Sequence, residues 1–139
     1  MKTTQKIFTV LITMVIAVFF ITGNVYSQAK KPWNIPDKDK NAKSTANLKD
    51  QTVISNGKDL WAKHCKSCHG SKGLGDGPKA ASLKTNPGDF SSAAFQGQTD
   101  GELFYQTSKG RDEMPAYDKK IPEANDRWAL VAFMRTMKK

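Results

Sequence analysis

The chain has 139 residues, with 22 basic and 13 acidic side chains and a formal charge of +9. This length allows one domain with appendages. A basic balance is compatible with nucleic acid, an anionic membrane surface, an acidic protein partner, or a solvated lysine-rich surface without a specific partner. Nucleic acid is excluded, because the N-terminus has the pattern of an export signal and the chain has no recognisable nucleic-acid-binding module.

The first 27 residues have the parts of a secretory signal peptide. Lys2 and Lys6 form a basic start, an apolar run follows from Ile7 to Ile21, and Val25 and Ser27 are small enough for a cleavage site. An uncleaved membrane anchor is the alternative, but the apolar run is shorter than the about twenty residues that a span needs. We therefore expect export to the periplasm, with cleavage after Ser27.

Residues 28–51 are polar and have the composition of a linker or loosely packed arm. Their bulky apolar side chains are Trp33, Ile35 and Leu48, and Trp33 could dock on the folded part. The compact domain is expected over residues 52–139. A domain of this size without disulfides has a small core, so a large buried apolar cofactor would supply the missing interior.

The two cysteines of the chain stand in the sequence Cys65-Lys66-Ser67-Cys68-His69, a C-x-x-C-H. This pattern attaches a c-type haem through two thioethers, and the histidine binds the iron. On a helix, residues three and four apart share one side, so both thiols and the imidazole could reach one ligand. A disulfide between these cysteines would close almost no loop. Zinc is a weak alternative, because structural zinc usually draws its ligands from two separated knuckles.

Helical signals recur along the compact domain, and no segment alternates with period two for long enough to predict a strand. The expected helices are a first one starting near Ser55 or Asn56, a short one within 79–84, one from the capping box Thr99-x-x-Glu102 to Gly110, and a last one starting near Pro122. The last helix carries the apolar run 128–134, so we expect it to be buried against the first.

Residues 70–78 form a glycine-rich turn that ends in Pro78. A phosphate-binding loop is a poor alternative, because no strand precedes it and no Gly-Lys-Ser/Thr ends it. We expect the turn to fold around the edge of a haem, with the Pro78 carbonyl accepting the second imidazole N–H of His69. Such a partner fixes the ring and makes it a better ligand. Pro87 is the second candidate for this role.

A second strong ligand would make an electron-transfer centre, whereas an empty position permits gas binding or peroxide chemistry. Met114 is the methionine that lies in a loop, and Pro115 keeps its backbone extended. We favour Met114 as the second axial ligand. His64 is the competitor, but it adjoins Cys65 and would have to cross to the far face of the haem.

Together these residues resemble a class I c-type cytochrome of the small single-haem kind, from about Gly57 to the end. The resemblance rests on Cys65-x-x-Cys68-His69, Gly-Asp-Gly-Pro at 75–78, Leu83, Pro87, Gly110, Met114-Pro115-Ala116 and Trp128. It implies an all-α fold of three to five helices around one covalently bound haem c, ligated by His69 and Met114. It also implies that the first and last helices cross, with Gly57 allowing close approach to an aromatic such as Trp128.

The resemblance implies an electron carrier between redox proteins, not an enzyme. The alternative is a cytochrome subunit of a larger oxidoreductase, either a dehydrogenase or a terminal oxidase. A haem peroxidase or gas sensor would need an open iron and, for peroxide, a distal acid–base group. The basic surface is expected to meet acidic docking surfaces on redox partners, with peripheral membrane contact as a further possibility.

Overall fold

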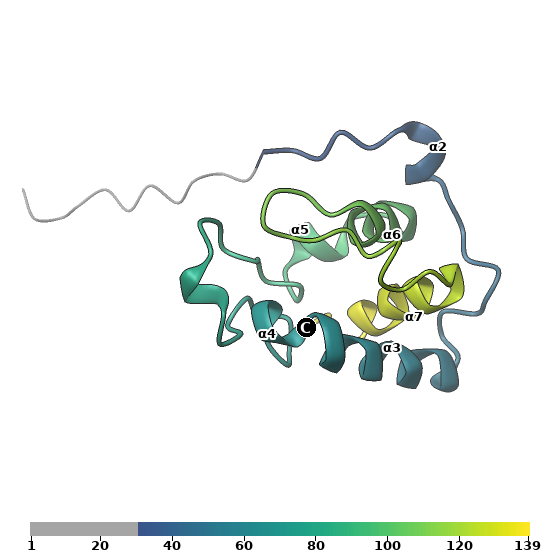
Figure 1. Cartoon of the computed structure of the whole chain (residues 1–139). Coiled ribbons are helices and arrows are strands. Elements are labelled where there is room, and N and C mark those ends of the chain that lie inside the picture. Colours follow the sequence, from purple (N-terminus) through teal and green to yellow (C-terminus); the bar gives the residue numbers. More distant parts are fainter. Residues whose placement is uncertain (1–30) are drawn as a thin grey trace, which may run out of the picture.

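The structure is a computed structural model that describes residues 31–139, and the predicted signal peptide lies outside the described residues (Figure 1). The elements are α2 (Asp37–Lys40), α3 (Gln51–His64), α4 (Lys66–His69), η1 (Ala80–Ser82), α5 (Ala93–Gln96), α6 (Asp100–Lys109) and α7 (Ala124–Arg135). Within the described range, the β pairing outside these elements is an isolated bridge between Arg111 and Met114. The all-α prediction is confirmed.

The described residues contain six α-helices, one more than the upper limit of the predicted three to five. The helices α2, α4 and α5 have only four residues each, which is too short for a periodic pattern to reveal them. The short helix predicted within 79–84 is the 3₁₀ turn η1. None of the helices between residues 31 and 139 is long and apolar enough to cross a membrane.

Helix α3 begins earlier than the sequence predicted. Its cap is Asp50, whose Oδ1 accepts a hydrogen bond from the backbone N–H of Thr52 at 2.7 Å. The predicted caps Ser55 and Asn56 lie inside the helix and are exposed, and the Asn56 amide donates to Asp126 of α7 at 2.8 Å. Several residues in this stretch are able to cap a helix, and the one that does so is the first of them.

Helices α3 and α7 pack directly on each other, as predicted for the first and last long helices. The contact is close at Gly57, where a Cβ would lie 1.9 Å from the carbonyl oxygen of Ala129 and 3.0 Å from the Cβ of Phe133. The predicted partner Trp128 faces elsewhere, because one residue rotates about 100° around a helix axis. Its ring stacks on Phe104 of α6, with the ring centroids 4.1 Å apart.

Helix α7 contributes to two clusters of buried side chains. The first cluster consists of Trp61, Cys65, Phe90, Tyr117, Ile121, Leu130 and Met134, and the second of Leu103, Trp128 and Val131. The neighbours Leu130 and Val131 belong to different clusters, and both are fully buried. The last helix is thus buried on two sides, as its apolar run predicted. The first cluster includes Cys65, so the core reaches the C-x-x-C-H motif.

Helix α6 begins at the predicted capping box. The Thr99 hydroxyl oxygen accepts from the backbone N–H of Glu102 at 3.1 Å, and the Thr99 N–H donates to the Glu102 carboxylate at 2.7 Å. The helix is capped at its other end by Gly110, with φ of 58°. An ion pair between Arg135 Nε and Asp100 Oδ1 at 2.7 Å joins α6 to α7.

The described part of the predicted arm, residues 31–50, lies against the helical domain (Figure 1). Ile35 is only 5% exposed. The hydroxyl of Thr99, the N-cap of α6, donates to the carbonyl oxygen of Lys40 at 2.6 Å, and Leu48 packs against the second cluster. These contacts join the arm to α6, whereas the division of the chain into three segments stays a prediction.

We predict that Gly57→Ala lowers the free energy of unfolding by about 1–3 kcal/mol, the usual cost of overpacking a core contact. The added methyl group would overlap the carbonyl oxygen of Ala129. Chemical denaturation of both proteins measures the difference. Gly97→Ala is the matched control, because Gly97 is exposed and its nearest atom would be the carbonyl oxygen of Ala93 at 3.1 Å. Equal losses in the two variants would contradict a close helix contact at Gly57.

Candidate functional site

The C-x-x-C-H motif lies at the C-terminal end of α3. The helix ends at His64, the backbone turns at Cys65, and α4 continues for one turn. The backbone N–H groups of Cys68 and His69 both donate to the carbonyl oxygen of Cys65, at 3.2 and 3.0 Å. The predicted spacing therefore lies on helical backbone, and both thiols and the imidazole extend from a single turn.

The glycine-rich loop after α4 folds back onto the motif. Two of its backbone N–H groups and that of the next residue donate to motif carbonyls: Gly75 to His69 at 2.9 Å, Gly77 to Cys68 at 3.2 Å and Lys79 to Ser67 at 2.8 Å. These bonds satisfy carbonyls that a helix end leaves without intrahelical partners. Pro78 is held beside the motif by two of them. That its carbonyl accepts the His69 imidazole N–H stays a prediction.

The His69 imidazole lies among aromatic rings. Its centroid is 4.7 Å from that of Phe90 and 5.6 Å from that of Trp61. The Trp61 indole N–H donates to the carbonyl oxygen of Gly70 at 3.0 Å in a buried position, so the indole links α3 to the start of the loop. The sequence placed Trp61 on the motif face of the helix, but it gave no sign of this bond or of Phe90 beside the imidazole.

Both motif cysteines are free thiols. Cys65 is 8% exposed. Burial raises the pKa of its thiol to about 12, and the neighbouring Cys68 adds to the rise. The Cys65 sulfur is therefore uncharged at neutral pH. A thioether is also uncharged, so the surroundings of Cys65 suit both forms of the sulfur.

Met114 lies in the loop between α6 and α7 and is half-buried. Its backbone N–H donates to the carbonyl oxygen of Arg111 at 2.8 Å, and the Arg111 N–H donates back to the Met114 carbonyl at 2.9 Å. These two bonds close a tight turn of which Met114 is the last residue. The predicted extended backbone before Pro115 agrees with this position.

Tyr117 ties the Met114 loop to the motif. Its hydroxyl donates to the carbonyl oxygen of His64, the last residue of α3, at 2.7 Å, and its ring belongs to the same core cluster as Cys65. Burial raises the pKa of Tyr117 to about 12, with a smaller contribution from Cys65 and Cys68. The hydroxyl is protonated at neutral pH and able to donate. The sequence contained no signal for this contact.

Two further hydrogen bonds hold the same loop from another side. The Glu113 carboxylate accepts hydrogen bonds from the backbone N–H groups of Lys84 at 2.7 Å and Thr85 at 3.3 Å. Glu113 directly precedes Met114, so the loop is fixed to the segment after η1 as well as to α3. Carboxylate acceptors make stronger hydrogen bonds than neutral ones. This residue, too, was not singled out by the sequence.

The competing ligand His64 stands at the end of α3. Its ring packs edge-on against Tyr117, with centroids 5.9 Å apart. Burial lowers the pKa of its imidazole, and the charges of Lys63 and Lys120 lower it further. To act as a second ligand, the ring would have to leave Tyr117 while its neighbour Cys65 holds the haem.

The arrangement fits a covalently bound haem. Two free thiols and an imidazole leave one helical turn, and the loop behind them approaches so closely that a Cβ on Gly77 would lie 2.6 Å from the carbonyl oxygen of Ser67. Trp61 and Phe90 add aromatic surface beside His69. Sulfur and imidazole are the donors by which proteins hold c-type haem.

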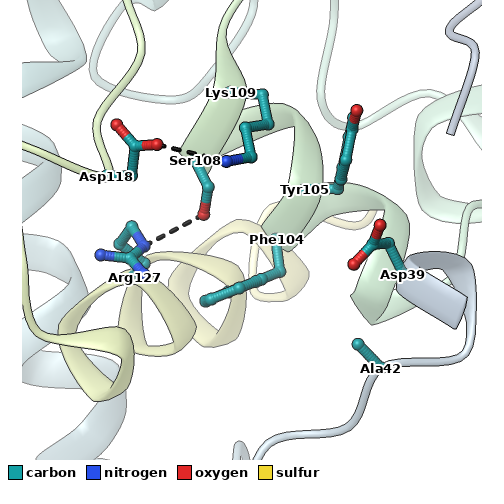
Figure 2. A pocket seen from close by; sticks show the side chains of 8 residues that line it. All are labelled: Asp39, Ala42, Phe104, Tyr105, Ser108, Lys109, Asp118 and Arg127. Carbon is teal, nitrogen blue, oxygen red and sulfur yellow. Dashed lines mark hydrogen bonds and ion pairs between the residues drawn. The ribbon is translucent and has the colours of Figure 1, made fainter. Parts of the chain in front are cut away.

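A pocket of about 160 Å³ lies between α2, α6 and α7 (Figure 2). It is lined by Asp39, Ala42, Phe104, Tyr105, Ser108, Lys109, Asp118 and Arg127. Three of its four charged residues have partners on its own wall: Lys109 pairs with Asp118 at 3.3 Å, and Arg127 Nε donates to the Ser108 hydroxyl at 3.0 Å. No predicted site residue lines this pocket, and we assign it no part in the site.

The chain resembles several solved structures, among them the following two. One belongs to the "Kuenenia stuttgartiensis reducing HAO-like protein complex Kustc0457/Kustc0458", with a TM-score of 0.60 and 22% identity over 70% of this chain and 51% of that chain. The present chain thus spans about half of that protein. The other is "KustC0563 c-type cytochrome", with a TM-score of 0.53 and 29% identity over 60% of this chain and 98% of that chain. The helical fold and its C-x-x-C-H turn are those of a class I c-type cytochrome.

A family model described as "Cytochrome C oxidase, cbb3-type, subunit III" matches residues 52–134. This is more than half of the chain, and the chain belongs to that family. No curated protein matches the chain. The predicted resemblance is confirmed: the protein is a c-type cytochrome, a class that binds haem c and takes part in electron transfer.

We predict that Tyr117→Phe lowers the free energy of unfolding at neutral pH by about 1 kcal/mol, since the His64 carbonyl loses its donor. Tyr105→Phe is the matched control, because the Tyr105 hydroxyl makes no hydrogen bond to a residue between 31 and 139. Denaturant unfolding of the three proteins measures the effect. A loss as large in the control would contradict a specific role for the Tyr117 hydroxyl.

The wild type and Tyr117→Phe should also differ in how their free energy of unfolding changes in alkaline solution. The Tyr117 pKa is about 12 in the folded chain against 10.0 for an ordinary tyrosine. Between these values the unfolded chain releases the proton and the folded chain keeps it, so the wild type loses stability as the pH rises from about 10 to about 12. Tyr117→Phe lacks this loss, so the gap in free energy of unfolding between the wild type and the variant narrows. A gap that stays constant over this range would show that the folded hydroxyl ionises normally.

Proposed function

We propose that the protein is an exported electron carrier with one covalently attached haem c, whose iron is bound by His69 and Met114. The observation that carries the proposal is the hydrogen bond from the Tyr117 hydroxyl to the His64 carbonyl. It joins the loop of Met114 to the end of α3, directly before the motif that contains His69, which supports a single site for both candidate ligands. Two strong axial ligands leave no open position on the iron, which favours electron transfer over catalysis.

Each residue of the site has a distinct role in this proposal. Cys65 and Cys68 hold the haem through thioethers, and His69 gives the iron its imidazole ligand. The Pro78 carbonyl accepts the other imidazole N–H and keeps the ring in one orientation. Met114 would supply a thioether sulfur as the second protein ligand of the iron.

The bound haem would supply a reversible ferrous–ferric couple. The chain would tune the reduction potential of that couple: a methionine ligand raises it, and the rings of Trp61 and Phe90 beside His69 would limit the access of water. The bonds of Tyr117 and Glu113 hold the Met114 loop from two sides. They would keep the sulfur in place in both oxidation states, so little rearrangement accompanies each electron.

Exposed lysines surround the motif, among them Lys63, Lys66 and Lys79. Positive charge close to the site would steer the protein toward acidic docking surfaces of redox partners and speed encounter. The same charge would allow peripheral contact with an anionic membrane surface. The predicted signal peptide supports function in the periplasm.

A second candidate is a cytochrome subunit of a larger oxidoreductase. Two observations favour it: the matched family is described as an oxidase subunit, and one similar structure comes from a protein complex. The same haem would serve in either role. Co-purification of the full chain with a second redox protein supports this candidate, whereas isolation of the haem protein alone supports the diffusible carrier.

We predict that haem remains with the chain in denaturing electrophoresis. Haem staining should give a band at the mass of the protein in the wild type and no band after replacement of Cys65 and Cys68 by serine. Single replacements should each retain one thioether and some stain. Haem that leaves the denatured wild-type chain would contradict covalent attachment at the motif.

We predict that Met114→Ala lowers the reduction potential on the order of 0.1 V, a part of the about 0.8 V over which axial ligands tune haem. The six-coordinate low-spin absorption spectrum of the holoprotein should change with it. Met137→Ala is the control, since Met137 packs against the first core cluster. An unchanged spectrum and potential in Met114→Ala would remove this residue from the site.

A further inference from the structure

Residues 31–40, which we name the strap, lie over α6 (Figure 1). At one end of the strap, the carbonyl oxygen of Lys40 accepts from Thr99 at the start of α6. At the other end, Trp33 lies on Arg111, which follows the end of α6. The strap therefore reaches from the first turn of the helix to the loop that carries Met114.

The Lys40 end of the strap is tightly packed. A Cβ on Gly101 would lie 2.3 Å from the carbonyl oxygen of Asp39, so α2 rests on the backbone of α6. Ile35 in the middle of the strap is 5% exposed. A segment with a buried isoleucine and a backbone contact to α6 is an ordered part of the fold, in contrast to a free linker.

The Trp33 end holds the Arg111 side chain by two contacts. The guanidinium carbon of Arg111 lies 4.2 Å from the centroid of the Trp33 ring, and Arg111 Nη1 donates to the carbonyl oxygen of Lys31. Trp33 and Arg111 are both half-buried. A cation over an indole face is attracted by the ring, and more strongly where water is partly excluded.

Arg111 is coupled to Met114 through the backbone. The two residues exchange hydrogen bonds of 2.9 and 2.8 Å across the turn. Within that turn, Asp112 has a φ of 49°, a left-handed conformation that is uncommon for a residue other than glycine. Such a conformation persists where surrounding contacts hold it. Contacts that fix Arg111 therefore also fix the position of Met114.

We propose that the strap is a positioning element of the haem site: Trp33 holds Arg111 and thereby keeps the Met114 loop closed on the iron. The inference rests on the proposed ligation by Met114. Loss of the Trp33–Arg111 contact lets the turn open more often, which exposes the iron to outside ligands. A more weakly held sulfur also lowers the reduction potential, because the thioether is the ligand that raises it.

Imidazole displacement from the ferric holoprotein tests the inference. Trp33→Ala and Arg111→Ala are each expected to raise the rate at which added imidazole replaces Met114 about tenfold, as expected for the loss of one partly desolvated cation–ring contact. The potential should fall by less than in Met114→Ala. Trp33→Phe keeps an aromatic ring and Arg111→Lys keeps a cation, so the replacement rate of both variants should be closer to that of the wild type. Lys38→Ala, at an exposed strap residue, is the control and should equal the wild type.

The double variant Trp33→Ala/Arg111→Ala and amide hydrogen exchange distinguish the loss of this one contact from a general loss of stability. If Trp33 and Arg111 act through one contact, imidazole replaces Met114 in the double variant no faster than in either single variant. Hydrogen exchange of the 111–114 amides in the holoprotein should accelerate in Trp33→Ala, while that of α3 stays as in the wild type. Additive rates, or acceleration spread evenly over the chain, would overturn the inference.

Two results separate this inference from the proposed function. If Met114→Ala leaves the sulfur-to-iron charge-transfer absorption and the potential unchanged, the ligation fails and the inference fails with it. If Met114→Ala changes both while Trp33→Ala binds imidazole at the wild-type rate, the ligation stands and only the role of the strap is overturned.

Discussion

The contact between the backbones of α3 and α7 at Gly57 and Ala129 determines where the motif meets the core. Gly57, Trp61 and Cys65 follow one another at intervals of four residues and share one face of the helix. A shift of the crossing along α3 would move Trp61 and Cys65 away from the side chains of α7 with which they form the first cluster. The absence of a side chain at one position thus sets the register of the site.

Features that depend only on neighbours within a helical turn could be predicted. The spacing of the motif, the capping box at Thr99 and the apolar run of α7 are of this kind, because a few adjacent residues contain the whole signal. The start of α3 could not be predicted in this way. Asp50, Ser55 and Asn56 are all able to cap a helix, and Asn56 instead bonds across to α7.

The contacts that hold the Met114 loop were beyond prediction from the sequence. Each joins the loop to a distant segment: Tyr117 to a carbonyl of α3, Glu113 to N–H groups after η1, and Arg111 to the ring of Trp33. A loop tyrosine or glutamate has many possible partners, and every residue has a backbone carbonyl, so the sequence does not indicate which one accepts the bond. Only the packed fold determines which partner is reached. The candidate ligands could be named from the sequence, whereas their supports could not.

The burial of Cys65 has a consequence for the order in which the protein is assembled. Cys65 is 8% exposed and its thiol has a pKa of about 12, so it meets few reagents and is not a thiolate at neutral pH. In the unfolded chain the same sulfur is accessible and ionises more easily. Modification of this cysteine is therefore easier in the unfolded chain, and a chain that folds before modification buries its reactive group. Slow folding before modification would then be an advantage to this protein.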